Sequence, residues 1–263
     1  MVSAIVFTIL LLTAIIVFYF KVRSVSREIK LGKEQKITDN RTKRWKLMLR
    51  VAIGQSKMVK RPVSAILHIF VYVGFIIVNI EMLEILIDGI SGTHRFFSFT
   101  GSIYPVFISS FEIFALLVII GCIVFLLRRN VVKVDRFWNR EMKKWPRTDA
   151  NIILVTEIFL MSAILLMNAS DTILQQRGES HYVQTGGYLI SGMIAPLLSG
   201  WSTEALIFTE RFAWWFHIIG VLVFLNYIPY SKHFHVFLSF PNVYYSKLES
   251  PGKIDNMPSI TKE

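Results

Sequence analysis

The chain has 263 residues, of which 53% are hydrophobic and only 18% are charged, whereas soluble proteins carry about 25% charged residues. The net charge of +11 would also suit a nucleic-acid-binding protein. Here the Lys and Arg residues lie in loops beside long apolar segments, where such residues set topology and contact anionic lipids. Composition therefore predicts an integral membrane protein and argues against nucleic-acid binding.

Five apolar segments are long enough to cross a bilayer. A spanning helix needs about 20 mainly apolar residues, because the hydrocarbon core is about 30 Å thick and a helix rises about 1.5 Å per residue. The first segment lacks the positive region and the cleavage site of a secretory signal, so we expect a retained helix. Pro62 suits the first turn of the second helix, and Ser202 suits the N-cap of the fifth. The predicted spans are 2–20, 62–87, 103–127, 150–168 and a fifth from 204 past 227.

A shorter apolar segment, 188–198, lies between the fourth and fifth spans. Gly192 and Pro196 interrupt it, and it is too short to cross the bilayer, so we expect it to lie at the interface or to re-enter partway. The predicted fold is all-α, a membrane bundle of about five transmembrane helices plus an interfacial helix. Residues 1–240 are expected to form the transmembrane domain and residues 241–263 a polar tail.

The distribution of basic residues predicts the orientation of the bundle. The loops 21–61 and 128–147 carry 14 and eight Lys or Arg residues, whereas the loops 88–102 and 169–203 carry one each. Basic loops remain in the cytoplasm. We therefore expect the amino terminus outside and both basic loops and the carboxyl-terminal tail inside.

The histidines are the main candidates for chemistry, since ionisable groups within a membrane are usually functional. His94 and His181 fall in the two weakly charged loops, where we expect solvated side chains. The remaining histidines lie in or beside the predicted spans, at His68, His217, His233 and His235.

The spacing of these histidines favours particular faces of the fifth helix. His217 and His235 are 18 residues apart, about five helical turns, so both project from one face if the helix continues. On the same condition His233 points nearly the opposite way. Two histidines on one face, opposite a histidine on another helix, suit bis-histidine haem ligation in a bundle. Hydrogen bonding between helices explains the same pattern.

The segment from His217 to His235 resembles the last span of the respiratory nitrate reductase gamma subunit. In that family, two histidines 18 residues apart flank a Pro-aromatic-Ser-basic segment, which is Pro229-Tyr230-Ser231-Lys232 here. Leu67-His68 is similar to the first haem histidine of that family. The resemblance covers the spans from Pro62 onward.

The chain resembles more closely a related group, the membrane cytochrome b domain of heterodisulfide-reductase-like iron-sulfur oxidoreductases. The segments that carry this resemblance are Arg147-Thr148-Asp149-Ala150, Pro229 to His235, Pro241-Asn242-Val243 and Pro251-Gly252-Lys253. The resemblance implies a haem b subunit of a bacterial inner-membrane oxidoreductase, which transfers electrons between membrane quinone and a cytoplasmic iron-sulfur protein.

The resemblance also implies the haem ligands. By position, His68 and His235 are the axial ligands of the iron of one haem near the cytoplasmic face. The gamma subunit has a second histidine ten residues after the first, and this chain has Val78 there. His217 is therefore a further cofactor-binding candidate without its expected partner. Either one haem is lost, or His217 uses another ligand, or it serves as a hydrogen-bonding residue.

Buried carboxylates provide a second set of candidates. Glu81 or Glu84 would suit a proton acceptor during quinol oxidation, although contact with the interface or a neighbouring helix explains them as well. Glu112 and Glu157 lie inside the third and fourth spans, and Glu210 with Arg211 suits a local ion pair.

The lone cysteine limits what the chain does by itself. Cys122 excludes a disulfide within the chain, and a cluster needs about four cysteines, so we expect the clusters in a partner or a further domain. One alternative function is a non-redox anchor that docks a cytoplasmic complex to the membrane. A small transporter fits less well, because matching broken spans in two halves are missing.

Overall fold

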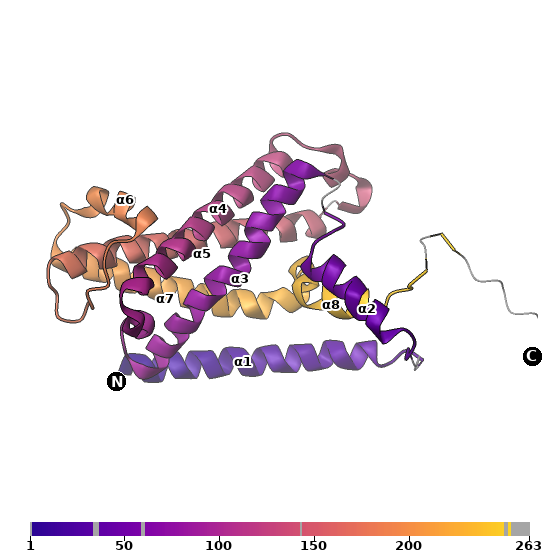
Figure 1. The fold of residues 1–263 in the computed structure, drawn as a ribbon, viewed down its shortest axis with the longest axis horizontal. Helices are drawn as coiled ribbons and strands as arrows, with labels where there is room; N and C mark the ends of the chain where they lie inside the picture. Colours follow the sequence, from indigo (N-terminus) through magenta and orange to yellow (C-terminus); the bar gives the residue numbers. More distant parts are fainter. Residues whose placement is uncertain (1, 34–36, 59–60, 143, 250–251, 254–263) are drawn as a thin grey trace, which may run out of the picture.

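The computed structural model describes residues 2–33, 37–58, 61–142, 144–249 and 252–253, and these form an all-α bundle (Figure 1). Within these ranges, five helices are long and apolar enough to cross a membrane. They are α1 (Val2–Ile29), α3 (Pro62–Ser91), α4 (Tyr104–Asn130), α5 (Trp145–Gln176) and α7 (Thr203–Tyr227). The predicted fold class and the five spans are confirmed.

Shorter helices lie at the two ends of the bundle. The longest of them are α2 (Arg41–Met48), α6 (Leu189–Leu198) and α8 (His235–Tyr244). The predicted short apolar segment is therefore helical as α6. Short 3-10 or π-helical segments lie at Leu49–Ile53, Phe96–Ile103, Asp135–Phe137, Arg140–Met142, Ile228–Tyr230 and Lys232–Phe234.

The chain passes back and forth between two ends of the molecule, which are separated along the horizontal axis of Figure 1. One end holds the start of α1, the connection between α3 and α4, and α6; we call it the α6 end. The other holds α2, α8 and the connection between α4 and α5; we call it the basic end. Both lysine- and arginine-rich loops lie at the basic end, as five successive spans require.

Helix α5 lies at the centre and packs against α4, α6 and α7. Its Leu160 belongs to a buried cluster that also contains Val78 of α3 and Val118 of α4. Small residues permit close approach, as is usual between membrane helices. A Cβ atom on Gly220 of α7 would lie 2.6 Å from the side chain of Leu160, and one on Gly74 of α3 would lie 2.5 Å from that of Val118.

Helix α1 is peripheral and packs mainly against α3 and α7, with Phe18 also near Phe237 of α8. Phe7 is its one buried residue, and a Cβ atom on Gly89 of α3 would lie 2.5 Å from the Phe7 ring. The amide of Asn226 donates to the carbonyl of Ala14 at 3.2 Å. Most other α1 side chains face outward, as expected where lipid surrounds a helix.

Helices α1, α3, α4 and α5 extend beyond the predicted apolar segments, whereas α7 ends at Tyr227, although its span was expected to continue. The largest difference is in α5, which includes polar residues before 150 and after 168. Asp149, Asp171 and Gln175 are almost fully buried there, because other parts of the chain supply hydrogen-bond partners. Ser202 caps α7 as predicted and accepts from the backbone N–H of Ala205 at 3.2 Å.

The predicted boundary at residue 240 falls inside a helix, since α8 continues through Pro241 to Tyr244. Arg44 of α2 holds the end of α8 by donating to the carbonyl oxygens of Tyr244 at 3.0 Å and Ser246 at 2.8 Å. Residues 250, 251 and 254–263 of the predicted tail lie outside the described residues.

Candidate functional site

His68 and His235 come together at the basic end of the bundle. His68 is half-buried near the start of α3, and His235 is exposed at the start of α8. They lie close enough to interact electrostatically. The Nδ1 atom of His68 is buried without a hydrogen-bond partner in the described part of the chain. The Nδ1 atom of His235 lies 2.9 Å from the carbonyl oxygen of Lys232, which leaves its Nε2 atom free to act as a ligand.

His233 joins this pair, although a continuous helix would place it on the opposite side from His235. Its ring centroid lies 5.7 Å from that of His235 and 5.4 Å from that of Phe224. Burial, followed by the neighbouring His235, lowers the pKa of His233 to about 4. The Nε2 atom of His233 is buried and has no hydrogen-bond partner in the described ranges.

The premise of a continuous helix from His217 to His235 is wrong, because α7 ends at Tyr227. Pro229 lies in the following turn, and Ser231 is extended with φ −106° and ψ 157°. The hydroxyl of Ser231 accepts from the backbone N–H of His233 at 2.9 Å and starts a new turn. The spacing of 18 residues therefore does not place His217 and His235 on one helical face.

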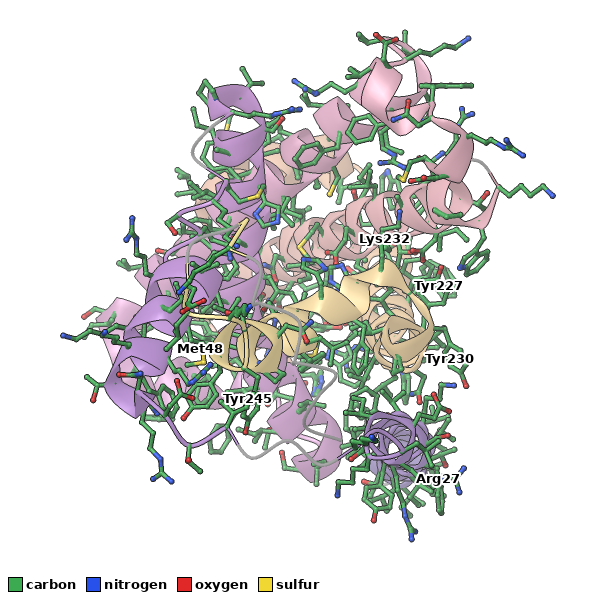
Figure 2. All side chains as sticks on the ribbon, turned by 90° about the vertical axis from the view of Figure 1, so that its right-hand side faces the viewer. Arg27, Met48, Tyr227, Tyr230, Lys232 and Tyr245 are labelled. Atoms are coloured by element: carbon green, nitrogen blue, oxygen red, sulfur yellow. The ribbon has the colours of Figure 1, made fainter. Side chains whose placement is uncertain are left out.

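Asp149 of α5 stabilises this break from the opposite side. Its carboxylate accepts from the Tyr227 hydroxyl at 2.5 Å and from the Lys232 backbone N–H at 3.0 Å. Figure 2 views the basic end and shows Tyr227, Tyr230 and Lys232 around the short segment before α8. The carboxylate thus connects α5 to both sides of the break.

Sequence reasoning identified both partners of this contact but did not pair them. The segments 147–150 and 229–235 are two of those that carry the resemblance, and the structure brings them into contact through Asp149. A polar residue at the start of an otherwise apolar span was the available signal.

His217 lies alone in the middle of the bundle and is 1% exposed. Its Nδ1 atom lies 2.9 Å from the carbonyl oxygen of Leu160, and its Nε2 atom has no partner in the ranges described. Val78, at the position where the nitrate reductase gamma subunit has its second histidine, is packed in the same apolar cluster as Leu160. This packing leaves His217 without the second ligand that another haem requires.

The pair at the basic end fits a haem b better. Bis-histidine ligation needs two imidazoles that each present a free ring nitrogen to the iron. His68 has a buried nitrogen without a partner, and the Lys232 carbonyl fixes one nitrogen of His235. The described residues contain no cluster of three or more His, Cys, Asp or Glu side chains that could hold a bare metal ion.

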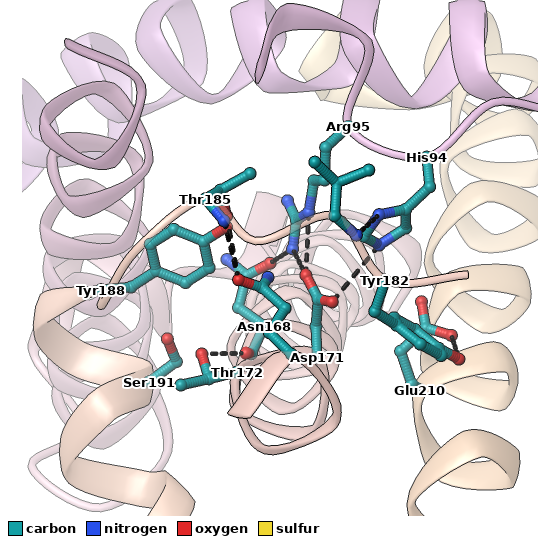
Figure 3. Close-up of polar contacts among 12 residues, drawn as sticks. His94, Arg95, Asn168, Asp171, Thr172, Tyr182, Thr185, Tyr188, Ser191 and Glu210 are labelled. Carbon is teal, nitrogen blue, oxygen red and sulfur yellow. Dashed lines mark hydrogen bonds and ion pairs between the residues drawn. The ribbon is translucent and has the colours of Figure 1, made fainter. Parts of the chain in front are cut away.

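A buried polar network lies at the α6 end (Figure 3). Arg95, in the connection before α4, donates to Asp171 at 2.6 and 2.9 Å and to the side-chain oxygen of Asn168 at 2.7 Å. The His94 Nε2 atom lies 3.3 Å from Asp171. The expected solvated side chain is wrong for His94, whose side chain is only 8% exposed. The network ties the α3–α4 connection to α5.

Two predicted carboxylates organise neighbouring backbone. Glu84 accepts from the backbone N–H of Phe97 at 2.8 Å and from the Tyr104 hydroxyl at 2.7 Å. Glu112 accepts from the backbone N–H groups of Ile190 at 2.8 Å and Ser191 at 3.1 Å, so it caps the start of α6. Contact with neighbouring elements therefore accounts for these two carboxylates.

The other predicted carboxylates differ in their partners. Glu210 forms the predicted ion pair with Arg211 and also accepts from the Tyr182 hydroxyl at 3.2 Å. Glu81 is 1% exposed, and neither of its oxygens has a hydrogen-bond partner among the residues described. Glu157 is half-buried on α5.

Curated relatives of this chain are oxidoreductases. The chain is 29% identical over 255 residues to a probable iron-sulfur-binding oxidoreductase, FadF, of Bacillus subtilis (strain 168). The aligned region covers 97% of this chain and 34% of that protein. It is 24% identical over 203 residues to the EtfAB:quinone oxidoreductase of Syntrophomonas wolfei subsp. wolfei. That alignment covers 75% of this chain and 27% of the relative. The chain therefore spans about a third of the length of these relatives.

No family model matches the chain, and no solved structure matches it. The relationship to oxidoreductases with iron-sulfur and quinone links supports an electron-transfer role for a multi-pass membrane protein.

Proposed function

We propose that the chain is a membrane haem b subunit that transfers electrons between membrane quinone and a cytoplasmic iron-sulfur oxidoreductase. The observation that carries this proposal is that His68 and His235, from helices far apart in the sequence, lie close enough to interact electrostatically. Two imidazoles with ring nitrogens available at one place in a helical bundle suit axial ligation of haem iron.

The relatives supply the two electron partners in this proposal. One relative is described as an iron-sulfur-binding oxidoreductase and the other as a quinone oxidoreductase. This chain has one cysteine, Cys122, which is buried and insufficient for a cluster. The clusters therefore belong to a partner protein or to a further domain.

The charge distribution supports an orientation with the basic end in the cytoplasm. Both basic loops lie at this end, and lysine and arginine residues beside membrane spans favour the cytoplasmic side. In this orientation, the protein lies in the inner membrane of a bacterial cell and its amino terminus is on the outer side. The haem ligands then lie on the side from which a cytoplasmic cluster protein approaches.

The residues of this chain would hold and orient the cofactor. His68 and His235 would hold the iron, and Asp149 would position His235 by fixing the backbone of Lys232. A bound haem b supplies a one-electron carrier, whose potential the protein tunes through ligation and burial. We propose one haem, because Val78 lies in the packed core where a second ligand for His217 is expected.

The difference in absorption between reduced and oxidised protein tests the haem. The protein is purified from membranes after expression with haem supplied, and a b-type α-band is expected. His68→Ala and His235→Ala are each expected to remove the band. His181→Ala, an exposed histidine at the α6 end, is the matched control and is expected to keep it. A wild-type protein without the band would contradict the haem proposal and favour the non-redox anchor.

Two further histidine variants test the ligand assignment. His233→Ala and His217→Ala are expected to keep the full band, since neither residue is a ligand in this proposal. If His233→Ala removes the band while His235→Ala keeps it, His233 is the ligand instead. If His217→Ala halves the band, the chain holds a second haem.

A further inference from the structure

Helix α2 and the turn after it carry an apolar stripe that stays exposed among the described residues. Trp45, Leu49 and Ile53 follow one another at intervals of four residues, which places them near one face of the helix. They are 53%, 49% and 46% exposed. A continuous exposed apolar surface marks a contact with another molecule or with lipid.

The face beside this stripe is strongly basic. Lys43, Lys46 and Arg50 are exposed there, and the segment 41–61 holds eight Lys or Arg residues and no Asp or Glu. Apolar side chains on one face and basic side chains on the next are typical of a helix that lies in the plane of the membrane interface and contacts anionic lipids.

The third face of the helix fixes it to the bundle. Met48 is buried there, and Figure 2 shows it beside Tyr245 where α2 packs against α8. Arg44 is 5% exposed and donates to the carbonyl oxygen of Tyr244 at 3.0 Å. These contacts hold the helix in one orientation, with the apolar stripe turned away from the bundle.

Contacts with α1 show how deep this region lies. The ring centroid of Phe18 in α1 lies 6.4 Å from that of Phe237 in α8, and the ammonium group of Lys21 lies 4.1 Å from the centre of the Tyr230 ring. Lys21 is the first charged residue after the apolar part of α1. The layer formed by α2 and α8 is therefore level with the edge of the bilayer at the basic end.

Aromatic residues agree with this depth. The ring centroid of Trp45 lies 5.5 Å from that of Tyr244, and Tyr245 is exposed next to it. Trp and Tyr are enriched at the level of the lipid head groups. At this depth the apolar stripe reaches the acyl chains while the lysine and arginine side chains stay at the phosphates. The position therefore favours lipid over a soluble protein as the occupant of the stripe.

We propose that α2 and the turn after it bind an anionic phospholipid, such as phosphatidylglycerol, in the leaflet at the basic end. Trp45, Leu49 and Ile53 insert between the acyl chains, and Lys43, Lys46 and Arg50 pair with the phosphate groups. A zwitterionic lipid also carries a phosphate, but only an anionic lipid has a net negative charge for the basic face. The inference does not depend on the haem or on the electron partners.

Quenching by brominated lipids measures the contact between the stripe and the bilayer. Leu49→Cys is labelled with a thiol-reactive bimane. Cys122 is 0% exposed and is expected to stay unlabelled, which the wild type treated in the same way checks. The labelled full chain is placed in phosphatidylcholine nanodiscs that contain increasing fractions of brominated phosphatidylglycerol or brominated phosphatidylcholine. Half-maximal quenching is expected at an about tenfold lower fraction of the phosphatidylglycerol.

The test variant removes the basic face from the labelled chain by Lys43→Gln, Lys46→Gln and Arg50→Gln together. It is expected to lose the preference for phosphatidylglycerol and to keep the quenching by brominated phosphatidylcholine, because the apolar stripe is unchanged. The matched control removes three exposed cations from the α4–α5 connection and is expected to keep the preference. Its changes are Lys133→Gln, Arg140→Gln and Lys144→Gln.

Coinciding titrations of the labelled parent chain with the two brominated lipids would overturn the proposal, since the stripe would then enter the bilayer without selecting an anionic lipid. Absence of quenching by either lipid would overturn it too, and would show that the stripe faces water and suits a soluble protein. A control variant that loses the preference as completely as the test variant would assign the effect to net charge and reject α2 as the site.

Discussion

The buried ion pair between Arg95 and Asp171 yields a quantitative prediction about stability. Asp171→Asn keeps the shape of the side chain but removes its charge. Arg95 then retains a bond to Asn168 but loses the anion to which it donates at 2.6 and 2.9 Å. A guanidinium that is 5% exposed would be left without its main counter-charge, in a place that water reaches poorly.

The size of the effect follows from what it costs to break a buried pair. Removing one partner typically costs about 3–5 kcal/mol, because the other charge remains buried. The remaining bond to Asn168 favours the lower end, so we expect a loss of about 3 kcal/mol. For a protein of this size, that loss lowers the melting temperature by roughly 6–12 °C.

Thermal unfolding in a mild detergent, followed by circular dichroism, measures this effect. Ser170→Ala is the matched control, since Ser170 is fully buried beside Asp171 and its hydroxyl has no hydrogen-bond partner in the described chain. We expect it to change stability by less than about 0.5 kcal/mol. The double variant Arg95→Met with Asp171→Leu is expected to recover most of the loss. A shift for Asp171→Asn no larger than that of Ser170→Ala would refute the reasoning.

Three further predictions concern helix packing and helix ends. Gly89→Ala places a methyl group against the Phe7 ring and is expected to lower the melting temperature through overpacking of about 1–3 kcal/mol, whereas Gly192→Ala, with open space around it, is not. Ser202→Ala removes the α7 cap and is expected to lower the free energy of unfolding, measured with denaturant, by about 1 kcal/mol. An unchanged free energy of unfolding would contradict the role of the cap. Glu112→Ala frees two backbone N–H groups of α6 and is expected to speed hydrogen exchange there, and unchanged protection would show that another group holds α6.

The spans were predictable from the sequence because length and hydropathy alone determine whether a helix crosses a bilayer. The ends of the spans were not. Helix α5 begins at Trp145 and ends at Gln176, well outside its apolar segment, because Asp149 and Asp171 find partners on other elements. In a sequence, a carboxylate indicates the end of a span unless its partner is known.

The resemblance selected the candidate ligands, but it did not give their arrangement. A helical wheel assumes that the helix continues, and here it ends at Tyr227 before Pro229. His233 consequently lies beside His235. The burial of His94 was not predictable either. This histidine lies in a loop but is buried, because the distant helix α5 supplies an anion, Asp171.

The length and exposure of α1 make the thickness of the membrane a physical variable for this protein. With 28 residues, α1 is about 42 Å long. Its apolar part, residues 2–20, is about 28 Å long and matches a hydrocarbon core about 30 Å thick. In a thicker or thinner bilayer, a spanning helix tilts or moves its charged end relative to the head groups, and Arg23 and Arg27 lie where α1 emerges at the basic end. A change in tilt that pivots at the Phe7 contact with Gly89 moves Ser3 and Ala4 relative to α3. Lipids with longer or shorter acyl chains are therefore expected to alter the packing of α1 against α3 at the α6 end.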